Sequence, residues 1–132
     1  MVAPRRAVAD TSLFIGLEAR RFDDQALVGL DLGVSVITLG ELRLGVVSAS
    51  HNPDAASRRL ATYELARQFQ PLPIDERVSD AWALLVAKLR AEGRKAPIND
   101  SWIAATALAH NLPLATQDTD YDVMPGLTVL KI

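Results

Sequence analysis

The 132-residue chain, 49% hydrophobic, is typical of one globular domain with a single buried core, and we expect one domain over residues 1–132. Because it contains no cysteine, disulfides, thiolate zinc sites and cysteine nucleophiles are excluded, and any metal ion must have oxygen or histidine ligands. The formal charge of −2 at pH 7 argues against simple polyanion binding, and the absence of an apolar run of about eighteen residues or a signal-peptide core predicts a cytoplasmic protein without a membrane segment.

The first predicted elements are a strand over residues 6–9 and a helix that follows it. Asp10 then falls at the carboxyl end of the strand, the edge at which open parallel sheets bind ligands. Asp10 or Ser12 can equally serve as the cap of the helix, so the local sequence leaves both roles open. Residues 23–30 are typical of a second short helix.

Residues 34–47 predict a strand that leads into a helix. The β-branched run over residues 34–37 favours the strand. Thr38 and Glu41 have the spacing of a capping box, in which the glutamate bonds back to the amide of the cap residue. Glu41 is therefore either a helix cap or a functional acid.

Two helices and a strand are predicted between residues 52 and 97. Asn52, Pro53 and Asp54 combine a cap, a first-turn proline and an acid that suits the helix dipole. The residues expected to be buried on this helix are Ala61, Leu65 and Phe69. The prolines in residues 71–74 favour a strand near the edge of the sheet. Asp75 is expected to cap a long helix that ends near Gly93.

The C-terminal part places an acid at each end of a helix–strand pair. Apolar residues follow Asp100 at helical spacing, and the helix is expected to begin at this acid. Its expected buried stripe consists of Ile103, Ala104, Ala107 and Leu108. Residues 114–116 predict a short strand, Asp118 follows it, and a last strand is expected over residues 127–132.

Strands alternate with helices along the whole chain, which predicts an α/β fold: a three-layer α/β/α sandwich with a short, mostly parallel central sheet. Glycine-rich nucleotide-binding loops are absent.

Four acids then share the carboxyl edge of the sheet: Asp10, Glu41, Asp100 and Asp118. Clustered carboxylates repel one another unless a hard cation such as Mg²⁺, or alternatively Mn²⁺, joins them. Such a cation lowers the pKa of a bound water and screens an attacked phosphate, so the pattern indicates metal-assisted phosphodiester hydrolysis.

Other candidate groups are interpreted as structural. His51 lies in a polar linker and His110 at a helix end, where histidines are mostly solvated or interact with the helix dipole. Trp82 and Trp102 fall within helical patterns and are expected in the core rather than as platforms for nucleic-acid bases. Arg43, close to Glu41, is either a contact to a substrate backbone or a surface charge.

Four segments carry a combined motif, written Ala7-Val8-Ala9-Asp10-Thr11-Ser12, Glu-Leu-x-x-Gly at 41–45, Asn99-Asp100-x-x-Ile103-Ala104-Ala105, and Leu112-Pro113-Leu114-Ala115-Thr116-x-Asp118-x-Asp120-Tyr121. In order and spacing, over nearly the whole chain, they resemble the PIN-domain nucleases. More narrowly, they resemble the VapC toxins of bacterial toxin–antitoxin pairs.

The resemblance implies a catalytic, metal-binding tetrad formed by Asp10, Glu41, Asp100 and Asp118, with Asp10 and Asp100 as the main Mg²⁺ ligands. It also implies supporting roles for Thr11, Asn99 and Asp120. Tyr121 stands where phenylalanine is commoner in the family, and Gln117 where a basic residue is common. We expect these two departures to leave the metal site untouched and to affect substrate contacts instead.

The function implied by the resemblance is that of a Mg²⁺-dependent endoribonuclease, the toxin of a toxin–antitoxin pair, that cleaves RNA. Its implied partners are a cognate VapB-like antitoxin and a second copy in a homodimer. The alternatives are a PIN nuclease that acts in RNA processing or on structured DNA without a toxin role, and a catalytically silent PIN-like interaction module. A phosphotransferase with Asp10 as nucleophile would usually have a second acid two residues on, where this chain has Ser12.

Overall fold

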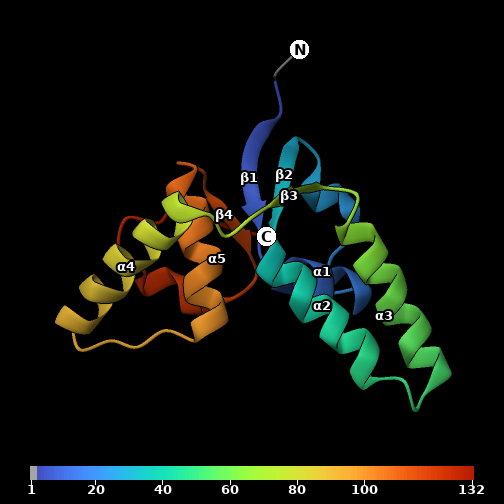
Figure 1. Ribbon diagram of the computed structural model, residues 1–132. Coiled ribbons are helices and arrows are strands. Elements are labelled where there is room, and N and C mark those ends of the chain that lie inside the picture. Colours follow the sequence, from blue (N-terminus) through green and yellow to red (C-terminus); the bar gives the residue numbers. More distant parts are fainter. Residues whose placement is uncertain (1–2) are drawn as a thin grey trace.

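Five parallel strands form one central sheet in the computed structural model, which describes residues 3–132, so that residues 1 and 2 of the expected domain lie outside the described part (Figure 1). The strands are β1 (Arg5–Ala9), β2 (Leu30–Ser35), β3 (Gln70–Leu72), β4 (Leu114–Thr116) and β5 (Val129–Lys131). Their order across the sheet is β3-β2-β1-β4-β5, and each neighbouring pair is parallel. The carboxyl ends of β1 and β4 therefore lie side by side in the middle of the sheet, with Ala9 paired to Ala115.

Helices cover both faces of the sheet, which confirms the predicted α/β class. They are α1 (Thr11–Glu18), α2 (Val36–Ser48), α3 (Pro53–Ala66), α4 (Glu76–Ala91) and α5 (Ile98–Ala109), with short 3-10 helices η1 (Asp24–Leu27) and η2 (Thr119–Val123). Within residues 3–132, none of the helices has the length and apolar character that a membrane span requires.

The two faces of the sheet bury separate apolar clusters because successive side chains of a strand point to opposite sides. Val8 of β1 packs with residues of α4 and α5, whereas its neighbours Ala7 and Ala9 pack with residues of α1, α2 and α3. All three are fully buried. In Figure 1, α4 and α5 stand on one side of the sheet and α2 and α3 on the other. The carboxyl edge of the sheet lies between these two helical layers.

The predicted caps of α3 and α4 are confirmed. The side chain of Asn52 accepts a hydrogen bond from the amide of Ala55, and that of Asp75 accepts one from the amide of Val78. Gly93 follows α4 with a φ of 70°, the left-handed conformation that glycine adopts at low cost. The helix expected to begin at Asp100 begins two residues earlier, so that Asp100 lies in the first turn of α5.

The strand predicted over residues 34–37 is wrong at its end. The strand β2 stops at Ser35, whose hydroxyl accepts a hydrogen bond from the amide of Ile37 and caps α2. Val36 and Ile37 are therefore helical, because the cap outweighs the strand preference of β-branched residues. The helix predicted over residues 23–30 is also wrong: only η1 forms there, and Leu30 already belongs to β2.

The buried line predicted for α3 is wrong at Ala61 and Leu65, whereas Phe69, which follows the helix, is partly buried and packs against the core as expected. Thr62 and Ala66 are its buried residues, whereas Ala61 is exposed and Leu65 is 37% exposed. The buried face lies one residue further along because the hydroxyl of Thr62 donates to Glu18 Oε1 of α1 at 2.8 Å. This contact turns a polar side chain of α3 toward its neighbour helix.

Candidate metal centre

Asp10 stands directly after β1 and is only 2% exposed. Its Oδ1 accepts hydrogen bonds from the amide of Ser12 at 3.1 Å and from the hydroxyl of Ser12 at 2.6 Å. The same acid thus caps α1 and stands at the carboxyl edge of the sheet, so the two roles left open by the sequence are compatible. Its own amide donates to the carbonyl of Ala115 at 3.1 Å, which ties the end of β1 to β4.

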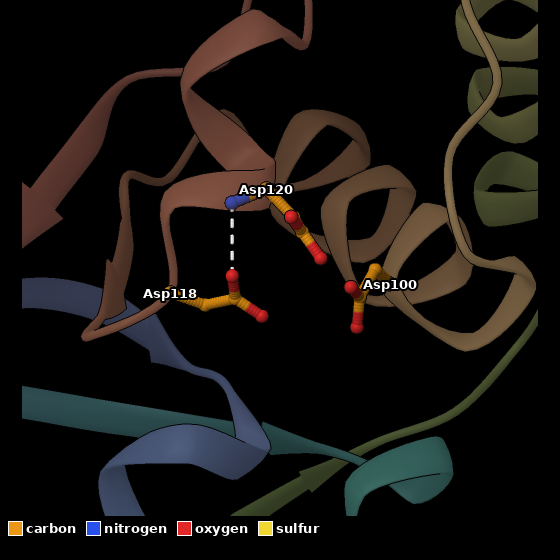
Figure 2. Close-up of side chains that lie close together, drawn as sticks. All are labelled: Asp100, Asp118 and Asp120. Atoms are coloured by element: carbon orange, nitrogen blue, oxygen red, sulfur yellow. Dashed lines mark hydrogen bonds between the residues drawn. The ribbon is translucent and has the colours of Figure 1, made fainter.

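Three further acids gather beside this edge, as Figure 2 shows. Asp100, Asp118 and Asp120 each offer a carboxylate oxygen, and these oxygens all lie within 4.8 Å of one another. Asp100 comes from the first turn of α5, while Asp118 caps η2 by accepting a hydrogen bond from the amide of Asp120 at 2.9 Å. Among the described residues, none of the ion pairs involves these three carboxylates. Lys131 comes near, but its Nζ donates to the carbonyl oxygen of Asp118 at 2.9 Å and pairs with Asp122, so that no ion pair among the described residues neutralises the carboxylates of the cluster.

Burial and mutual repulsion both act on these acids. The pKa of Asp100 is raised to about 6, chiefly by burial and also by the charges of Asp118, Asp10 and Asp120, while the hydrogen bond from Tyr121 opposes the rise. Burial also raises the pKa of Asp10, and the charge of Asp118 adds to this effect. These effects place Asp10 in the same electrostatic group as Asp100, Asp118 and Asp120.

A buried polar network holds the ends of β1 and β4 together. The hydroxyls of Ser12 and Thr116 lie 3.2 Å apart, and Thr116 Oγ1 accepts the amide of Asp118 at 2.8 Å. Ser12 Oγ also accepts the amide of Gln117 at 2.9 Å. Within residues 3–132, each fully enclosed polar side-chain atom has a hydrogen-bond partner. The network fixes Asp10 and Asp118 relative to each other, and the polar last residue of β4 was the only sequence sign of it.

Tyr121 lies beneath the cluster with no exposed surface. Its hydroxyl donates a hydrogen bond to Asp100 Oδ1 at 3.2 Å. Burial raises the pKa of Tyr121 far above its ordinary value, and the charges of Asp10 and Asp100 raise it further, so the hydroxyl keeps its proton and remains a donor. The expectation that Tyr121 leaves the metal site untouched is therefore wrong, because a phenylalanine would lack this bond.

Glu41 lies beside the four aspartates rather than among them. Its Oε1 accepts a hydrogen bond from the hydroxyl of Thr11 at 2.7 Å, and its Oε2 accepts one from Asn99 Nδ2 at 3.4 Å. Thr11 follows Asp10 in the chain and Asn99 precedes Asp100, so Glu41 is tied to both acids through their neighbours. The alternative role as a capping-box residue is wrong, since α2 begins after Ser35 and Glu41 bonds to other elements.

Arg43 and Gln117, whose contacts to a substrate the sequence left open, both lie against other parts of the fold. The guanidinium of Arg43 lies over the ring of Tyr63, 5.5 Å from its centroid, and so packs against α3. Gln117 lies against α1, where a Cβ added at Gly16 would come within 2.5 Å of its Oε1, and its Nε2 donates to the carbonyl of Ile132 at 3.4 Å. Neither side chain contacts the acids.

The donor set suits a hard divalent cation. The cluster offers carboxylate oxygens from Asp100, Asp118 and Asp120, with Asp10 close enough for its charge to raise the pKa of Asp100. Oxygen donors of this kind match Mg²⁺ and Mn²⁺ rather than softer metals. A cation at this position also relieves the repulsion that raises the pKa values of Asp10 and Asp100. The arrangement can therefore hold a metal and, with it, activate water against a phosphate.

Comparison with known proteins agrees with this geometry. The PIN domain family matches residues 7–127. Ribonuclease VapC4 from Mycobacterium tuberculosis is 63% identical over 128 residues, which cover 97% of this chain and 98% of the relative. Ribonuclease VapC5 from the same species is 40% identical, over 98% of this chain and 95% of the relative.

Solved structures show the same architecture. The crystal structure of VapBC-5 from Mycobacterium tuberculosis superimposes with a TM-score of 0.80 at 38% identity, and the match covers 98% of both chains. The structure of VapBC2 from Rickettsia felis, bound to a DNA fragment from its promoter, has a TM-score of 0.82 over 96% of this chain and 98% of the other. At 18% identity, this second match concerns the fold alone.

Proposed function

Because this chain belongs to the PIN-domain family, and within it to the VapC-type toxins, we propose that it is a Mg²⁺-dependent endoribonuclease, the toxin of a toxin–antitoxin pair. The main observation behind the proposal is the cluster of Asp100, Asp118 and Asp120 beside the buried Asp10, whose carboxylates take part in none of the ion pairs among the described residues. Such a cluster destabilises the metal-free protein because the like charges repel one another, and a hard cation bound between the carboxylates removes this repulsion. The proposal places the enzyme in the cytoplasm, where its RNA substrates are.

In this proposal Asp10 and Asp100 are the principal metal ligands, and Asp118 and Asp120 complete the acidic surface. A bound Mg²⁺ supplies a water of lowered pKa and screens the charge of the scissile phosphate. The chain itself fixes the geometry: Ser12 orients Asp10 through two hydrogen bonds, and Tyr121 holds Asp100 through one. Because these donors are already bonded, little rearrangement is needed when the cation binds.

Glu41 is proposed to act at the border of the metal centre. Thr11 and Asn99 donate to its two oxygens and hold the carboxylate in place. Glu41 is partly exposed, so it can reach a water or a hydroxyl of a bound substrate. A carboxylate held at this position can accept a proton from the attacking water or contribute to metal binding, and both roles depend on its negative charge.

The proposed partners are a VapB-like antitoxin and a second copy of the chain. Supporting the first, the similar VapBC-5 structure, at 38% identity, is that of a member of the VapBC family of toxin–antitoxin systems. A groove of about 310 Å³ next to Glu41 is lined by residues of α1, α2 and α3, and it has exposed apolar residues, Ile15 at 46% and Leu44 at 65%. An antitoxin segment that covers these side chains and extends an arginine to the acids would exclude the metal.

The test of the proposed function compares cleavage of total cellular RNA by the purified chain in Mg²⁺ and in EDTA. We expect cleavage in Mg²⁺ alone, and a loss of at least ~10²-fold in Asp118→Asn. The matched control is Asp80→Asn, which neutralises an exposed acid of α4 and should cleave like the wild type. Cleavage that is indifferent to EDTA, or equal in both variants, would contradict the proposal.

A second measurement addresses the toxin role. Co-expression with the small open reading frame next to this gene should rescue growth and yield a complex that co-purifies, and excess Mg²⁺ should compete with the antitoxin for the acids. If RNA is cleaved but the neighbouring frame neither rescues growth nor co-purifies, the chain is a processing nuclease rather than a toxin. Cleavage of structured DNA in preference to RNA would favour the other nuclease alternative.

A further inference from the structure

A cavity of about 420 Å³ lies between the C-terminal half of α4, the loop after it and the first turn of α5. It is separate from the acids. Its apolar wall includes Trp82, Val86 and Ile98. Its charged rim consists of Arg90, Arg94 and Lys95. An apolar wall beside several cations is the combination that proteins use to hold a base and a phosphate of a single strand.

Trp82 provides a rigid aromatic wall. Its ring stacks on that of Trp102, with centroids 4.4 Å apart and planes 6° from parallel, and its Nε1 donates to Ser101 Oγ at 2.9 Å. The expectation that both tryptophans lie in the core is wrong, because both are partly exposed and neither belongs to the buried apolar clusters. A ring fixed on one side by stacking and at its edge by a hydrogen bond needs little further ordering to receive a base.

The rim carries positive charge that the described residues neutralise in part, at Arg94 only. Among the described residues, no carboxylate lies within ion-pair distance of Arg90 or Lys95. Arg94 pairs with Glu92 at 3.5 Å, but both side chains are half exposed, so this pair is weak. On a chain with a net charge of −2, three cations around one cavity favour a negatively charged occupant.

The cavity and the acids share the first turn of α5. Ile98 and Ser101 line the cavity, while Asn99 and Asp100 between them belong to the metal centre. Figure 2 shows Asp100 at the start of α5, with its carboxylate toward Asp118 and Asp120. A strand with its scissile phosphate at the acids therefore needs to cross only the end of α5 to reach the cavity.

We propose that this cavity binds a nucleotide of a single-stranded RNA substrate that flanks the scissile bond. The base lies against Trp82 and the apolar wall, and neighbouring phosphates contact Arg90 and Lys95. This inference rests on the proposed ribonuclease function and adds to it a nucleotide-binding position outside the acids, which takes an unpaired base. An apolar wall cannot receive a base that is paired and stacked within a helix.

The test uses the fluorescence of Trp82 and Trp102, the only two tryptophans of the chain. Single-stranded RNA of about 12 random nucleotides, added in EDTA so that it is not cleaved, should quench this fluorescence, and duplex RNA should not. In the double variant Arg90→Gln/Lys95→Gln, we expect binding weaker by about tenfold. The slope of the logarithm of the binding constant against the logarithm of the salt concentration should decrease in magnitude by about 1.4, because each of the two lost phosphate contacts to a single strand contributes about 0.7.

Two further variants make the test specific. The control Arg21→Gln/Arg58→Gln removes the same charge from exposed positions of the chain outside this cavity, and should keep the salt dependence of the wild type. Val86→Gln makes the wall polar without removing a phosphate contact, so it should weaken binding several-fold at an unchanged salt dependence. Equal weakening by both charge variants would mean that RNA meets only a diffuse positive surface, and would overturn the inference.

Cleavage assays and mass measurements separate the remaining outcomes. If the wild type cleaves RNA in Mg²⁺ but Arg90→Gln/Lys95→Gln has an unchanged KM, the ribonuclease proposal stands and the cavity proposal fails. If the wild type neither binds nor cleaves RNA, both fail. If light scattering shows that Val86→Gln changes the oligomeric state while RNA binding is unchanged, a second copy covers the cavity, and the inference is overturned.

Discussion

The hydroxyl of Tyr121 donates a hydrogen bond to Asp100 Oδ1 across 3.2 Å, from a side chain that has no exposed surface. The two residues come from different elements, η2 and α5, and the bond joins the helix that carries one acid to the turn that carries Asp118 and Asp120. It also lowers the pKa of Asp100, against the larger effect of burial. The contact therefore affects both the position and the charge of a proposed metal ligand.

Tyr121→Phe should weaken metal binding while the fold is retained. Phenylalanine fills nearly the same volume, so the apolar packing survives, but Asp100 loses a donor that favours its charged form. We expect the dissociation constant for Mg²⁺, measured by titration calorimetry, to rise several-fold, and the free energy of unfolding in EDTA to change by only about 1 kcal/mol. The control Tyr63→Phe alters a tyrosine that packs under Arg43, and its metal affinity should match the wild type. Unchanged affinity in Tyr121→Phe would assign this residue to packing alone.

Asp100→Asn should not destabilise the metal-free protein. Asparagine keeps an oxygen that can accept from Tyr121, and it removes one of several like charges that repel one another. In EDTA, we expect its Tm to equal or exceed that of the wild type. With Mg²⁺ at about a hundredfold its dissociation constant, the wild type gains ~2.7 kcal/mol, and the order should reverse because the variant binds poorly. Parallel shifts of the two Tm values on Mg²⁺ addition would show that Asp100 does not bind the metal.

The stability of the metal-free protein should also depend on pH through Asp100. Burial raises its pKa from the ordinary 3.8 to about 6, so the folded state binds the proton more tightly than the unfolded chain does. The contribution of Asp100 to the free energy of unfolding is fully present below the pKa of the unfolded chain, and it is lost as the pH rises through the pKa of the folded state. The pKa of Asp10 is also raised, so its contribution has the same sign. In EDTA, the Tm difference between Asp100→Asn and the wild type should therefore grow between about pH 4 and about pH 6.5, the range spanned by the unfolded and folded pKa values. A difference that stays constant over this range would contradict the raised pKa.

Glu41→Gln should reduce cleavage more than stability. The glutamine oxygen can still accept from Thr11, and α2 is capped by Ser35, so the helix loses no cap. The substitution removes the negative charge, and we expect RNA cleavage in Mg²⁺ to fall by at least ~10²-fold. The matched control is Glu64→Gln on the exposed side of α3, which should cleave normally. Full cleavage by Glu41→Gln would leave Glu41 with a purely structural role between α1, α2 and α5.

The sequence by itself determined where the acids stand along the chain. Asp10 and Asp118 follow short strands that an apolar run predicts, and Asp100 lies at the start of a helix that an apolar stripe predicts. All of these signals are local in the sequence. Such signals act within a few residues, and they placed β1, β4 and the starts of α2 to α5 within one or two positions, but they failed for the helix predicted over residues 23–30. Local signals fail where two of them compete, as at Ser35, where a cap ends the strand that β-branched neighbours favour.

Only the tertiary structure decided which groups meet. Tyr121 bonds to Asp100 across 21 residues of sequence, Thr11 to Glu41 across 30, and Asn99 to Glu41 across 58. These contacts depend on the strand order β3-β2-β1-β4-β5, which sets the ends of β1 and β4 side by side and brings η2 under the first turn of α5. Strand order results from the packing of the whole core, and no local pattern encodes it. For this reason the sequence could place each acid at an edge, but the contacts of Tyr121 and Glu41 and the position of Asp120 beside Asp100 required the folded chain.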